Sequence, residues 1–345
     1  MSLPVSAASD AVRNILIVRL GAMGDVIHTL PAAVELKRCF PLARIAWAIE
    51  SRWAPLLRDN PYVDEVFEIP LGRWRKAKFS RATRREFADF RLNLRQAKFD
   101  LAVDFQGLIK SAVVAFFSRA ERVYGFDRSS LREPFSAVFY SNHTSTDAEH
   151  VVDRYRELAA SVRGLRPKGP VDFPLPEGSP KVGLPPRYVI ASPLAGWGAK
   201  QWPAEHFSTL ANLLWSRLAI PLLVDCAPNE EQIASTIAAG ADAGAVVVHA
   251  STIAELISAT RGASAVVGVD SGPLHLAKAL GRPGVAIFGP TDPRRNGPYG
   301  ESIEVLRAEG VETSYRREKD VAVAMRAVMP ESVFEKLRPL LESNG

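Results

Sequence analysis

The segment NILIVRLGAMGDVIHTLPAAV, residues 14–34, decides the fold class of this chain. Its first six residues, 14–19, form a short apolar run rich in β-branched side chains, which is typical of a buried parallel strand, and the run stops before Gly21. After Gly24 and Asp25, apolar residues recur at helical spacing, at positions 26, 30, 33 and 34. A strand, a turn with glycines and a helix in this order predict an α/β fold with a parallel sheet.

The same alternation continues along the chain. In the first half, further strands are predicted at residues 44–49, 65–69 and 100–104, and helices at 83–97 and 108–118. In the second half, strands are predicted at residues 188–192, 220–224, 245–248, 265–269 and 285–288, separated by helical segments. Each half is therefore expected to be a Rossmann-like domain.

A segment rich in proline separates the two halves. Residues 166–187 contain seven prolines and three glycines, and we interpret them as an interdomain linker. The predicted organisation is a loose leader at 1–13, an N-terminal domain at 14–165, the linker, a C-terminal domain at 188–330, and a helix at 331–345 that packs back on the N-terminal domain. Two such parallel sheets are expected to face a central cleft, with ligands at the carboxyl ends of the strands.

Composition excludes several classes of protein. The 345 residues are 47% hydrophobic and 23% charged, which suits a globular chain of about two domains. The only cysteines, Cys39 and Cys226, cannot form a disulfide framework or a multi-cysteine metal site, so a reducing compartment is expected. Residues 1–13 do not have the pattern of a secretory signal, and the sequence contains no apolar run long enough to cross a membrane. We therefore expect a cytoplasmic protein.

Positive charge collects in the first half. Residues 1–165 carry 25 Lys and Arg against 19 Asp and Glu, whereas residues 166–345 carry 18 against 19. Within the first half, residues 73–98 hold ten basic side chains and only two acidic ones. This basic stretch predicts an anionic partner, because clustered like charges raise the local concentration of anions. It is also compatible with a solvated helix face or a nucleic-acid-binding surface, although no nucleic-acid-binding module is recognisable.

Three loops at predicted strand ends carry candidate site residues. In LGAMGDV, residues 20–26, Asp25 either caps the following helix or acts in catalysis, and spacing alone leaves both readings open. In GVDSGPLH, residues 268–275, a strand leads into a helix whose N-terminus favours phosphate. The loop FGPTDP, residues 288–293, follows the next strand. The first loop lacks the third glycine of a dinucleotide fingerprint, which disfavours an NAD-dependent oxidoreductase.

Four blocks together carry a family resemblance. They are MGDVIHTLPA (23–32), DFQGLIKSA (104–112), KQWPAEHF (200–207) and VDSGPLHLAKALGRPGVAIFGPTDP (269–293). In this order they resemble the lipopolysaccharide heptosyltransferases, which are inverting glycosyltransferases with the two-domain GT-B fold. Two segments, RWRK (73–76) with Phe79 and Ser80, and REP (132–134) leading to Phe139 and Tyr140, are similar to heptosyltransferase I.

The resemblance implies a role for particular residues. Asp25 would be the general base and Lys200 would meet the donor phosphates during catalysis, while Glu230 would bind the ribose. The nucleotide-sugar site would further include Gly196, Asp270, Ser271, Gly272 and His275. The acceptor site would include Gly24, Arg73, Arg75, Lys76, Gln106 and Lys110. The loop at 193–199 lacks the hydroxyl side chains that the family often has there, so its phosphate contacts would come from backbone N–H groups.

The resemblance also implies substrates and location. The donor would be ADP-heptose and the acceptor a Kdo residue of Kdo-lipid A, with peripheral contact at the cytoplasmic face of the inner membrane. No cofactor, metal or nucleic acid is expected. Heptosyltransferase II, a GT-B epimerase and an anion- or nucleic-acid-binding protein remain as alternatives, and the sequence leaves the oligomeric state open.

Overall fold

The computed structural model describes residues 12–78, 80–314, 320 and 322–342. The chain divides into two compact units, Met1–Pro176 and Glu177–Gly345, and the division falls within the segment interpreted as a linker. Residues 1–11 of the predicted leader and Phe79 of the basic stretch lie outside the described residues.

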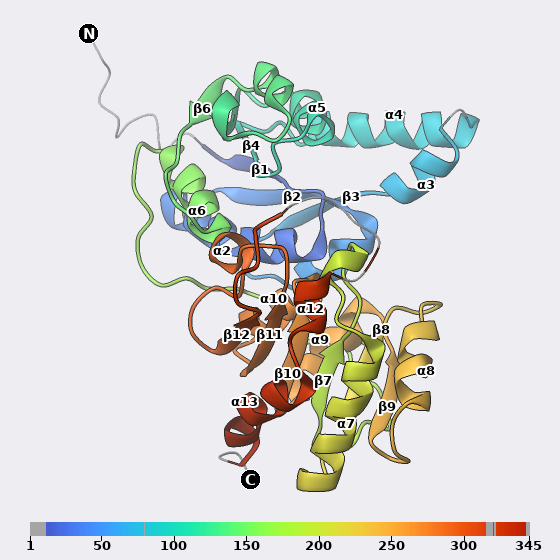
Figure 1. Cartoon of the computed structure of the whole chain (residues 1–345). Helices are drawn as coiled ribbons and strands as arrows, with labels where there is room; N and C mark the ends of the chain where they lie inside the picture. The colour runs from blue at the N-terminus through green and yellow to red at the C-terminus, as the bar shows by residue number, and fades with distance from the viewer. Residues whose placement is uncertain (1–11, 79, 315–319, 321, 343–345) are drawn as a thin grey trace. The chain divides into compact units, whose positions relative to one another are not determined.

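The first unit is a six-stranded parallel sheet with helices on both faces. In chain order its elements are β1 (Asn14–Val18), α2 (Met23–Cys39), β2 (Arg44–Glu50), η1 (Ser51–Leu57), β3 (Glu65–Ile69), α3 (Leu71–Lys76), α4 (Arg81–Gln96), β4 (Leu101–Asp104), α5 (Ile109–Ser118), β5 (Arg122–Phe126), η2 (Arg128–Ser130), η3 (Pro134–Phe139), β6 (Asn142–Thr144) and α6 (Val151–Ser161). Figure 1 shows α2 and α6 on one face of this sheet and α4 and α5 on the other. The strand order is β3-β2-β1-β4-β5-β6.

The second unit repeats this plan. Its elements are β7 (Val189–Ser192), η4 (Gly198–Lys200), α7 (Ala204–Leu218), β8 (Leu222–Cys226), α8 (Gln232–Ala239), β9 (Val246–Ala250), α9 (Ile253–Gly262), β10 (Ala265–Val269), α10 (Gly272–Ala279), β11 (Gly284–Phe288), α11 (Pro293–Asn296), β12 (Ile303–Arg307), α12 (Val323–Arg326) and α13 (Pro330–Glu342). The strand order β12-β11-β10-β7-β8-β9 is that of the first unit, counted from its own first strand. The predicted α/β class with two Rossmann-like sheets is confirmed.

The sheet order explains where a site can form. In β1, each side chain from Ile15 to Val18 is 0% exposed, because helices cover both faces of a parallel sheet. The neighbours of β1 are β2 and β4, so the chain leaves β1 toward one edge of the sheet and later returns on its other side. Ligands bind at such a switch point, beyond the carboxyl ends of the two central strands. The switch points here lie beyond β1 and β4 in the first unit and beyond β7 and β10 in the second.

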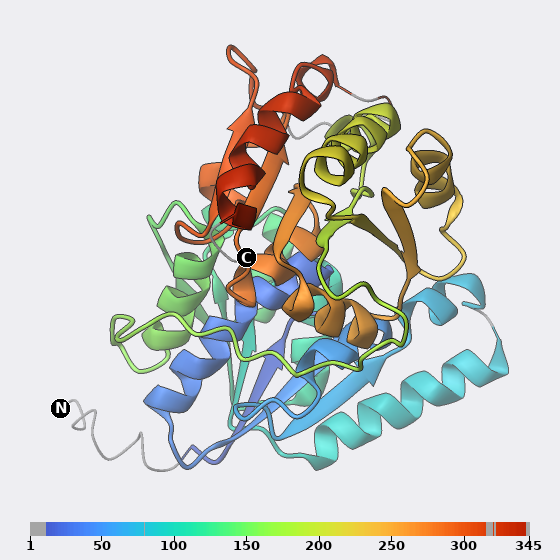
Figure 2. The ribbon, with the colours of Figure 1, turned by 90° about the horizontal axis from the view of Figure 1, so that it is seen from below.

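The last helix differs from the sequence expectation. It was predicted to pack on the N-terminal domain, but α13 contacts α7, β10 and β11 of the second unit, and Figure 2 shows it beside α7. Its buried side chains Val333, Phe334, Leu337 and Leu341 belong to the apolar core of that unit. The physical reason is that the apolar residues at positions 333, 334, 337 and 341 lie on one face of the helix. This apolar face is buried when the helix packs against the sheet of the second unit.

Candidate active site

The first switch point is built around a buried arginine that directly follows β1. The Arg19 side chain is 5% exposed, and its Nη2 lies 2.8 Å from Oδ1 of Asp25, whose side chain is 41% exposed. Nη1 of Arg19 donates to the carbonyl oxygen of Phe105, beyond β4, at 2.6 Å. Burial disfavours the charge of Arg19, but the nearby Asp25 and Tyr155 offset this and raise the pKa of the guanidinium group. Arg19 thus joins the two loops of the switch point and holds Asp25.

Asp25 is both a helix-capping residue and a partly exposed carboxylate. It is the third residue of α2, and its Oδ2 accepts a hydrogen bond from the backbone N–H of Ala22 at 3.1 Å. The positive end of the helix stabilises a carboxylate at this position. A carboxylate offers about four lone-pair sites, so these two contacts leave it able to accept another hydrogen bond. The two readings that the sequence left open therefore apply to the same side chain, since capping does not use up its acceptor capacity.

Gln106 completes the link between the two loops, and a buried carboxylate holds it there. Oε1 of Gln106 accepts from the backbone N–H of Leu20 at 2.9 Å. Asp104, 0% exposed at the end of β4, accepts from the N–H of Gln106 at 2.8 Å, and also from the Ser111 and Tyr140 hydroxyl groups at 2.8 and 2.7 Å. Burial raises the pKa of Asp104 despite these hydrogen bonds. Asp104 therefore anchors the loop that precedes α5, and with it the position of Gln106.

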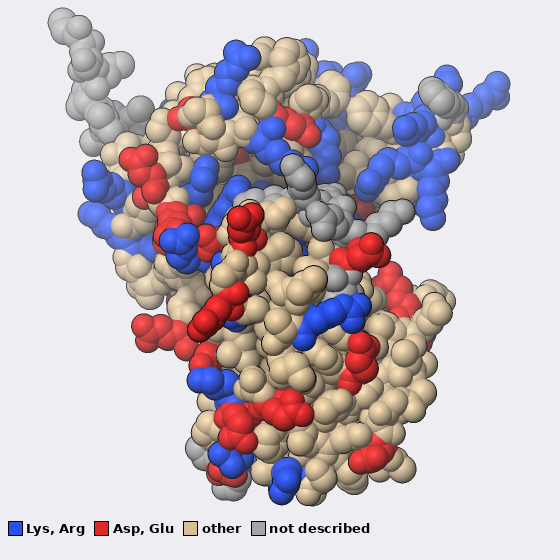
Figure 3. All heavy atoms as spheres, in the orientation of Figure 1, with Lys and Arg blue, Asp and Glu red and all other residues tan. Residues whose placement is uncertain are grey.

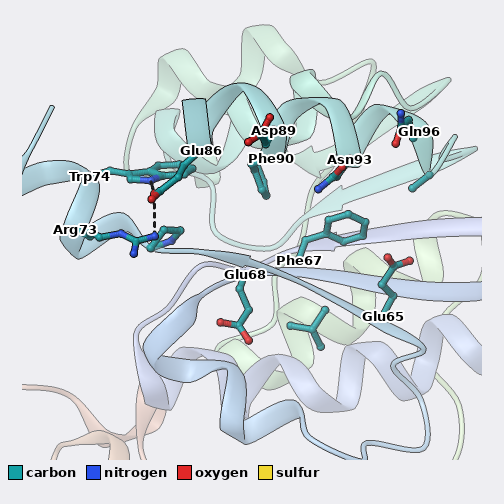
Figure 4. Close-up of a pocket in the computed structure, with 13 residues that line it drawn as sticks. Glu65, Phe67, Glu68, Arg73, Trp74, Glu86, Asp89, Phe90, Asn93 and Gln96 are labelled. Carbon is teal, nitrogen blue, oxygen red and sulfur yellow. Dashed lines mark hydrogen bonds and ion pairs between the residues drawn. The ribbon is translucent and has the colours of Figure 1, made fainter. Parts of the chain in front are cut away.

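Two basic residues of α3, Arg73 and Arg75, contact carboxylates. Arg73 and the indole N–H of Trp74 both contact Oε2 of Glu86 on α4, at 2.8 and 2.9 Å, as Figure 4 shows. These three residues line a cavity of about 650 Å³ between β3 and α4, into which Phe67 and Phe90 point, whereas the Glu68 side chain points away from α4 (Figure 4). Arg73 is therefore already paired with the Glu86 carboxylate, and an anionic ligand would compete with this ion pair.

Arg75 points to a different environment. Its Nη2 lies 3.8 Å from Oε1 of Glu50, a carboxylate that is 10% exposed at the end of β2. Partial burial lowers the pKa of Lys110, and the positive charge of the neighbouring Arg75 lowers it further. Arg75 and Lys110 are thus close enough to interact electrostatically, whereas Lys76 is exposed at the end of α3. Gly24 is buried within the first turn of α2.

The second switch point contains the predicted nucleotide-binding residues. Lys200, in the loop after β7, forms an ion pair with Asp270, which follows β10, and its Nζ also lies 4.4 Å from the centre of the Trp197 ring. Asp270 accepts from the Thr291 hydroxyl at 2.7 Å, and Nε2 of His275 is 3.7 Å from its other oxygen. Burial alone would raise the pKa of Asp270, but His275 and Lys200 outweigh it and hold that pKa well below its ordinary value.

Helix α10 opens directly beside this ion pair. Ser271 is its N-cap, yet the Ser271 hydroxyl caps no backbone N–H, and its buried oxygen has no hydrogen-bond partner within the described part of the chain. Gly272 is the first helical residue, so its N–H belongs to the positive end of the helix. A buried hydroxyl without a partner beside free helix N–H groups suits an anionic ligand such as phosphate.

The two remaining predicted nucleotide residues lie in more open surroundings. A Cβ atom added at Gly196 would meet no atom within 4 Å, so local packing does not require glycine there. Glu230 is exposed in the loop between β8 and α8. The same edge of the sheet carries buried Asp225, which contacts His249 at 3.0 Å and Ser251 at 2.6 Å. The sequence analysis assigned Asp225 no role.

Other residues of these sites, above all Arg19, were not predicted from the sequence. The only sequence signal for Arg19 was its position at the end of the predicted strand 14–19, just before a candidate loop. Thr291 lay within the quoted FGPTDP loop, but nothing in the sequence indicated that its hydroxyl contacts Asp270.

Among the described residues, no group of three or more His, Cys, Asp or Glu side chains is arranged to hold a metal ion. No helix in the described ranges has the length and hydropathy of a membrane span.

Comparisons with known proteins identify the family of this chain. Residues 87–324 match glycosyltransferase family 9 (heptosyltransferase). Lipopolysaccharide heptosyltransferase 1 of Escherichia coli O18:K1:H7 is 34% identical, over 87% of this chain and 93% of that protein. Lipooligosaccharide heptosyltransferase 2 of Haemophilus influenzae is 27% identical, over 95% and 99%. The structure of E. coli heptosyltransferase WaaC with ADP has a TM-score of 0.79 and 30% identity, over 96% of this chain and 100% of that one.

Proposed function

The chain belongs to glycosyltransferase family 9, and we propose from this premise how its residues carry out the transfer of a heptose. It is a glycosyltransferase of GT-B fold with the function of a heptosyltransferase I in lipopolysaccharide inner-core synthesis. We infer that it moves L-glycero-D-manno-heptose from ADP-heptose to a Kdo residue of Kdo-lipid A, at the cytoplasmic face of the inner membrane. The observation that carries the mechanism is the partly exposed Asp25 carboxylate, held by buried Arg19 at the first switch point.

The second unit is proposed to bind the donor. Lys200, the Ser271 hydroxyl, the N–H of Gly272 and His275 would contact the diphosphate, with backbone N–H groups near Gly196 adding to them. Glu230 would accept hydrogen bonds from the ribose hydroxyls. Asp270 is proposed to orient Lys200 and His275, since it is buried and contacts both. When the bond between the anomeric carbon and the diphosphate breaks, these donors would stabilise the negative charge of the departing ADP.

Asp25 is proposed to be the general base. The acceptor hydroxyl oxygen attacks the anomeric carbon from the face opposite the diphosphate, which inverts the configuration, and its proton passes to the Asp25 carboxylate. The ion pair with Arg19 fixes where the carboxylate lies before the attack. We propose that no metal ion or cofactor takes part.

The acceptor is proposed to bind beside Asp25 in the first unit. Arg75, Lys76 and Lys110 would contact the acidic groups of Kdo and its neighbours, and Gln106 and Gly24 would position the sugar. Arg75 is the strongest candidate of the basic residues, because its contact with Glu50 is long and its guanidinium fork matches a carboxylate. Arg73 is proposed to support α3 through Glu86, in addition to the acceptor role that the resemblance implied.

Mass spectrometry of the products tests the proposal. The protein is mixed with ADP-heptose and Kdo-lipid A, and a product heavier by one heptose is expected, with ADP released. Asp25→Asn should abolish most of the transfer, whereas Asp147→Asn, which changes an exposed carboxylate of the same unit, should not. Transfer only to an acceptor that already carries one heptose would instead identify a heptosyltransferase II, and no transfer to either acceptor would refute the proposal.

A further inference from the structure

A continuous row of aromatic rings runs across the helical face of the first unit. Six rings follow one another at centroid distances of 5.6–6.4 Å: Phe135, Phe139, Phe116, Phe117, Phe87 and Trp74. They come from η3, α5, α4 and α3, so residues far apart in sequence build one surface. We call this row the aromatic ladder.

Part of the ladder is open to solvent. Phe135 is 61% exposed, Phe116 is 46% exposed and Phe87 is 36% exposed. Two aliphatic side chains extend the surface, because Val138 is one 3-10 turn from Phe135 and Ile109 is two α-helical turns from Phe116. Val138 is 70% exposed and Ile109 is 42% exposed. Neighbouring exposed apolar side chains of this size mark an interaction surface more often than single ones do.

Arginine side chains lie against the same rings. The guanidinium of Arg119 is 5.6 Å from the centre of the Phe116 ring, and that of Arg91 is 5.6 Å from the centre of Phe117. Residues 73–98, which include α3 and α4, hold ten basic side chains and two acidic ones, and one of the acidic ones, Glu86, is paired with Arg73. Figure 3 shows Lys and Arg gathered over the end of α4 and the adjacent α3. The apolar surface therefore has a basic border.

We propose that the aromatic ladder and its arginines dock the protein onto the surface of an anionic lipid bilayer. Phe135, Val138 and Phe116 enter the interfacial region, while Arg91 and Arg119 contact lipid phosphates. Aromatic rings and arginines suit this boundary, since each combines an apolar body with a polar or charged end. Basic side chains near an anionic leaflet add electrostatic attraction to the binding. A second copy of the chain suits the surface less well, because pairing two such faces would bring the basic borders together.

Docking at this surface extends the proposed function. Trp74, at one end of the ladder, lies between Arg73 and Arg75 in α3. A bilayer on the ladder would therefore bring lipid headgroups to the proposed acceptor-binding residues. This step rests on the proposed lipid-linked acceptor, but membrane binding itself is measured without any substrate.

Vesicle sedimentation provides the direct test. The full chain is mixed with vesicles of phosphatidylcholine containing 30% phosphatidylglycerol, or of phosphatidylcholine alone. Binding to the anionic vesicles is expected, with weaker binding to the neutral ones. The double substitution Phe135→Ser and Val138→Ser should weaken binding by about tenfold or more, because it removes two exposed apolar side chains that would be buried in the interfacial region. Arg91→Gln with Arg119→Gln should weaken binding to anionic vesicles and reduce its salt dependence.

Matched controls separate docking from unfolding. Leu42→Ser changes an 81% exposed side chain of the same unit outside the ladder and should leave vesicle binding unchanged. Phe135→Trp should show a blue shift of tryptophan emission when anionic vesicles are added, relative to the native protein, whereas Leu42→Trp should show none. The substituted proteins should keep the native thermal midpoint within a few degrees, because the changed side chains are exposed.

Three results would overturn the proposal. They are an unmodified protein that does not sediment with anionic vesicles, ladder variants that bind as well as the native protein, and a concentration-dependent dimer that the ladder substitutions abolish. A transfer assay with a water-soluble Kdo acceptor that lacks acyl chains tests the proposed function separately from membrane binding. The Phe135→Ser and Val138→Ser variant should transfer heptose to it at the native rate, whereas a native protein that binds vesicles but transfers nothing would refute the proposed function alone.

Discussion

Replacing Asp25 in two ways separates its catalytic role from its structural one. Asp25→Ala removes the carboxylate that contacts Arg19 at 2.8 Å and the acceptor for the Ala22 N–H at 3.1 Å. Loss of the helix cap costs about 1 kcal/mol, and loss of a hydrogen bond to a charged group costs about 1.5–3 kcal/mol. Because the Asp25 side chain is 41% exposed, solvent screening places the second contribution at the lower end. We therefore expect Asp25→Ala to reduce the free energy of unfolding by about 2–3 kcal/mol.

Asp25→Asn is expected to behave differently in stability but not in catalysis. The amide oxygen of asparagine can still accept from Ala22 or Arg19, so the loss of stability should be about 1 kcal/mol. Neither variant retains a group that can take the acceptor proton, and both should lower kcat by about 10²–10⁴-fold. ADP affinity should change little, because the proposed nucleotide contacts belong to the other unit. Differential scanning calorimetry and the rate of ADP release with saturating substrates provide the two measurements.

A third variant supplies the control for this comparison. Arg19→Gln removes the partner of Asp25 and keeps the carboxylate, so it should lose stability yet retain a kcat well above that of Asp25→Asn. If Asp25 is only a capping residue, Asp25→Asn will turn over within about tenfold of the native rate. That result would refute the assignment of Asp25 as the general base, whatever the stability data show.

Further predictions concern the core, the thiols, the donor site and metal ions. Leu337→Ala should lower the free energy of unfolding by about 2–5 kcal/mol in urea titrations, because this side chain of α13 is 0% exposed in the second core; a loss below about 1 kcal/mol would contradict the packing of α13. Burial raises the pKa of Cys39 and of Cys226 to about 11, so a disulfide reagent at about pH 8 should label neither thiol until the chain is unfolded, and rapid labelling of the native protein would contradict this. The lowered pKa of Asp270 stabilises the fold above the ordinary carboxyl pKa of about 3.9, and this contribution is lost as the pH falls through the lowered value. The stability difference between the native protein and Asp270→Asn should therefore shrink below about pH 4, and a constant difference would argue against the ion pair with Lys200. Transfer should survive excess EDTA, whereas complete loss that magnesium restores would show that a metal ion is required.

Most strands could be predicted from the sequence, including the edge strands β3 and β9, but β5, β6 and β12 could not. Residues 265–269 were predicted with the bounds of the central strand β10, because a short apolar run is the pattern of a strand covered on both faces. Residues 65–69 match the edge strand β3, in which buried Phe67 and Ile69 alternate with exposed Glu68. β6, at the sheet edge, has only the three polar residues Asn142–Thr144 and therefore no apolar run to detect. β12, at the edge of the other sheet, mixes charged and apolar residues, since little covers it. Helix α13 was predicted, but the unit on which it packs was not. An apolar helix face indicates that the face is buried, and it does not indicate which part of the chain buries it.

The candidate site residues could be named singly from the sequence, but their contacts could not. Asp25, Lys200 and Asp270 each stood in a quoted motif. The contact between Arg19 and the Phe105 carbonyl joins residues 86 apart, and that between Lys200 and Asp270 joins residues 70 apart. Such contacts follow from the adjacency of β1 with β4 and of β7 with β10, which depends on strand order. Strand order in turn is set by how the whole sheet is covered, and no local pattern encodes it.

The two switch points are built in the same way, but they leave different hydrogen-bonding groups for a ligand. In each, one contact joins the loop after the first strand to the loop after the fourth: Leu20 with Gln106, and Lys200 with Asp270. At the first, the cation Arg19 is buried and the Asp25 carboxylate is partly exposed, so the atoms left for a ligand are hydrogen-bond acceptors. At the second, the Asp270 carboxylate is buried and already contacts Lys200, Thr291 and His275. There the atoms left over are donors, because an ammonium group has three protons and one contact with Asp270 leaves two. A site with spare acceptors suits removal of a proton, and a site with spare donors suits a departing diphosphate, which are the two tasks of an inverting sugar transfer.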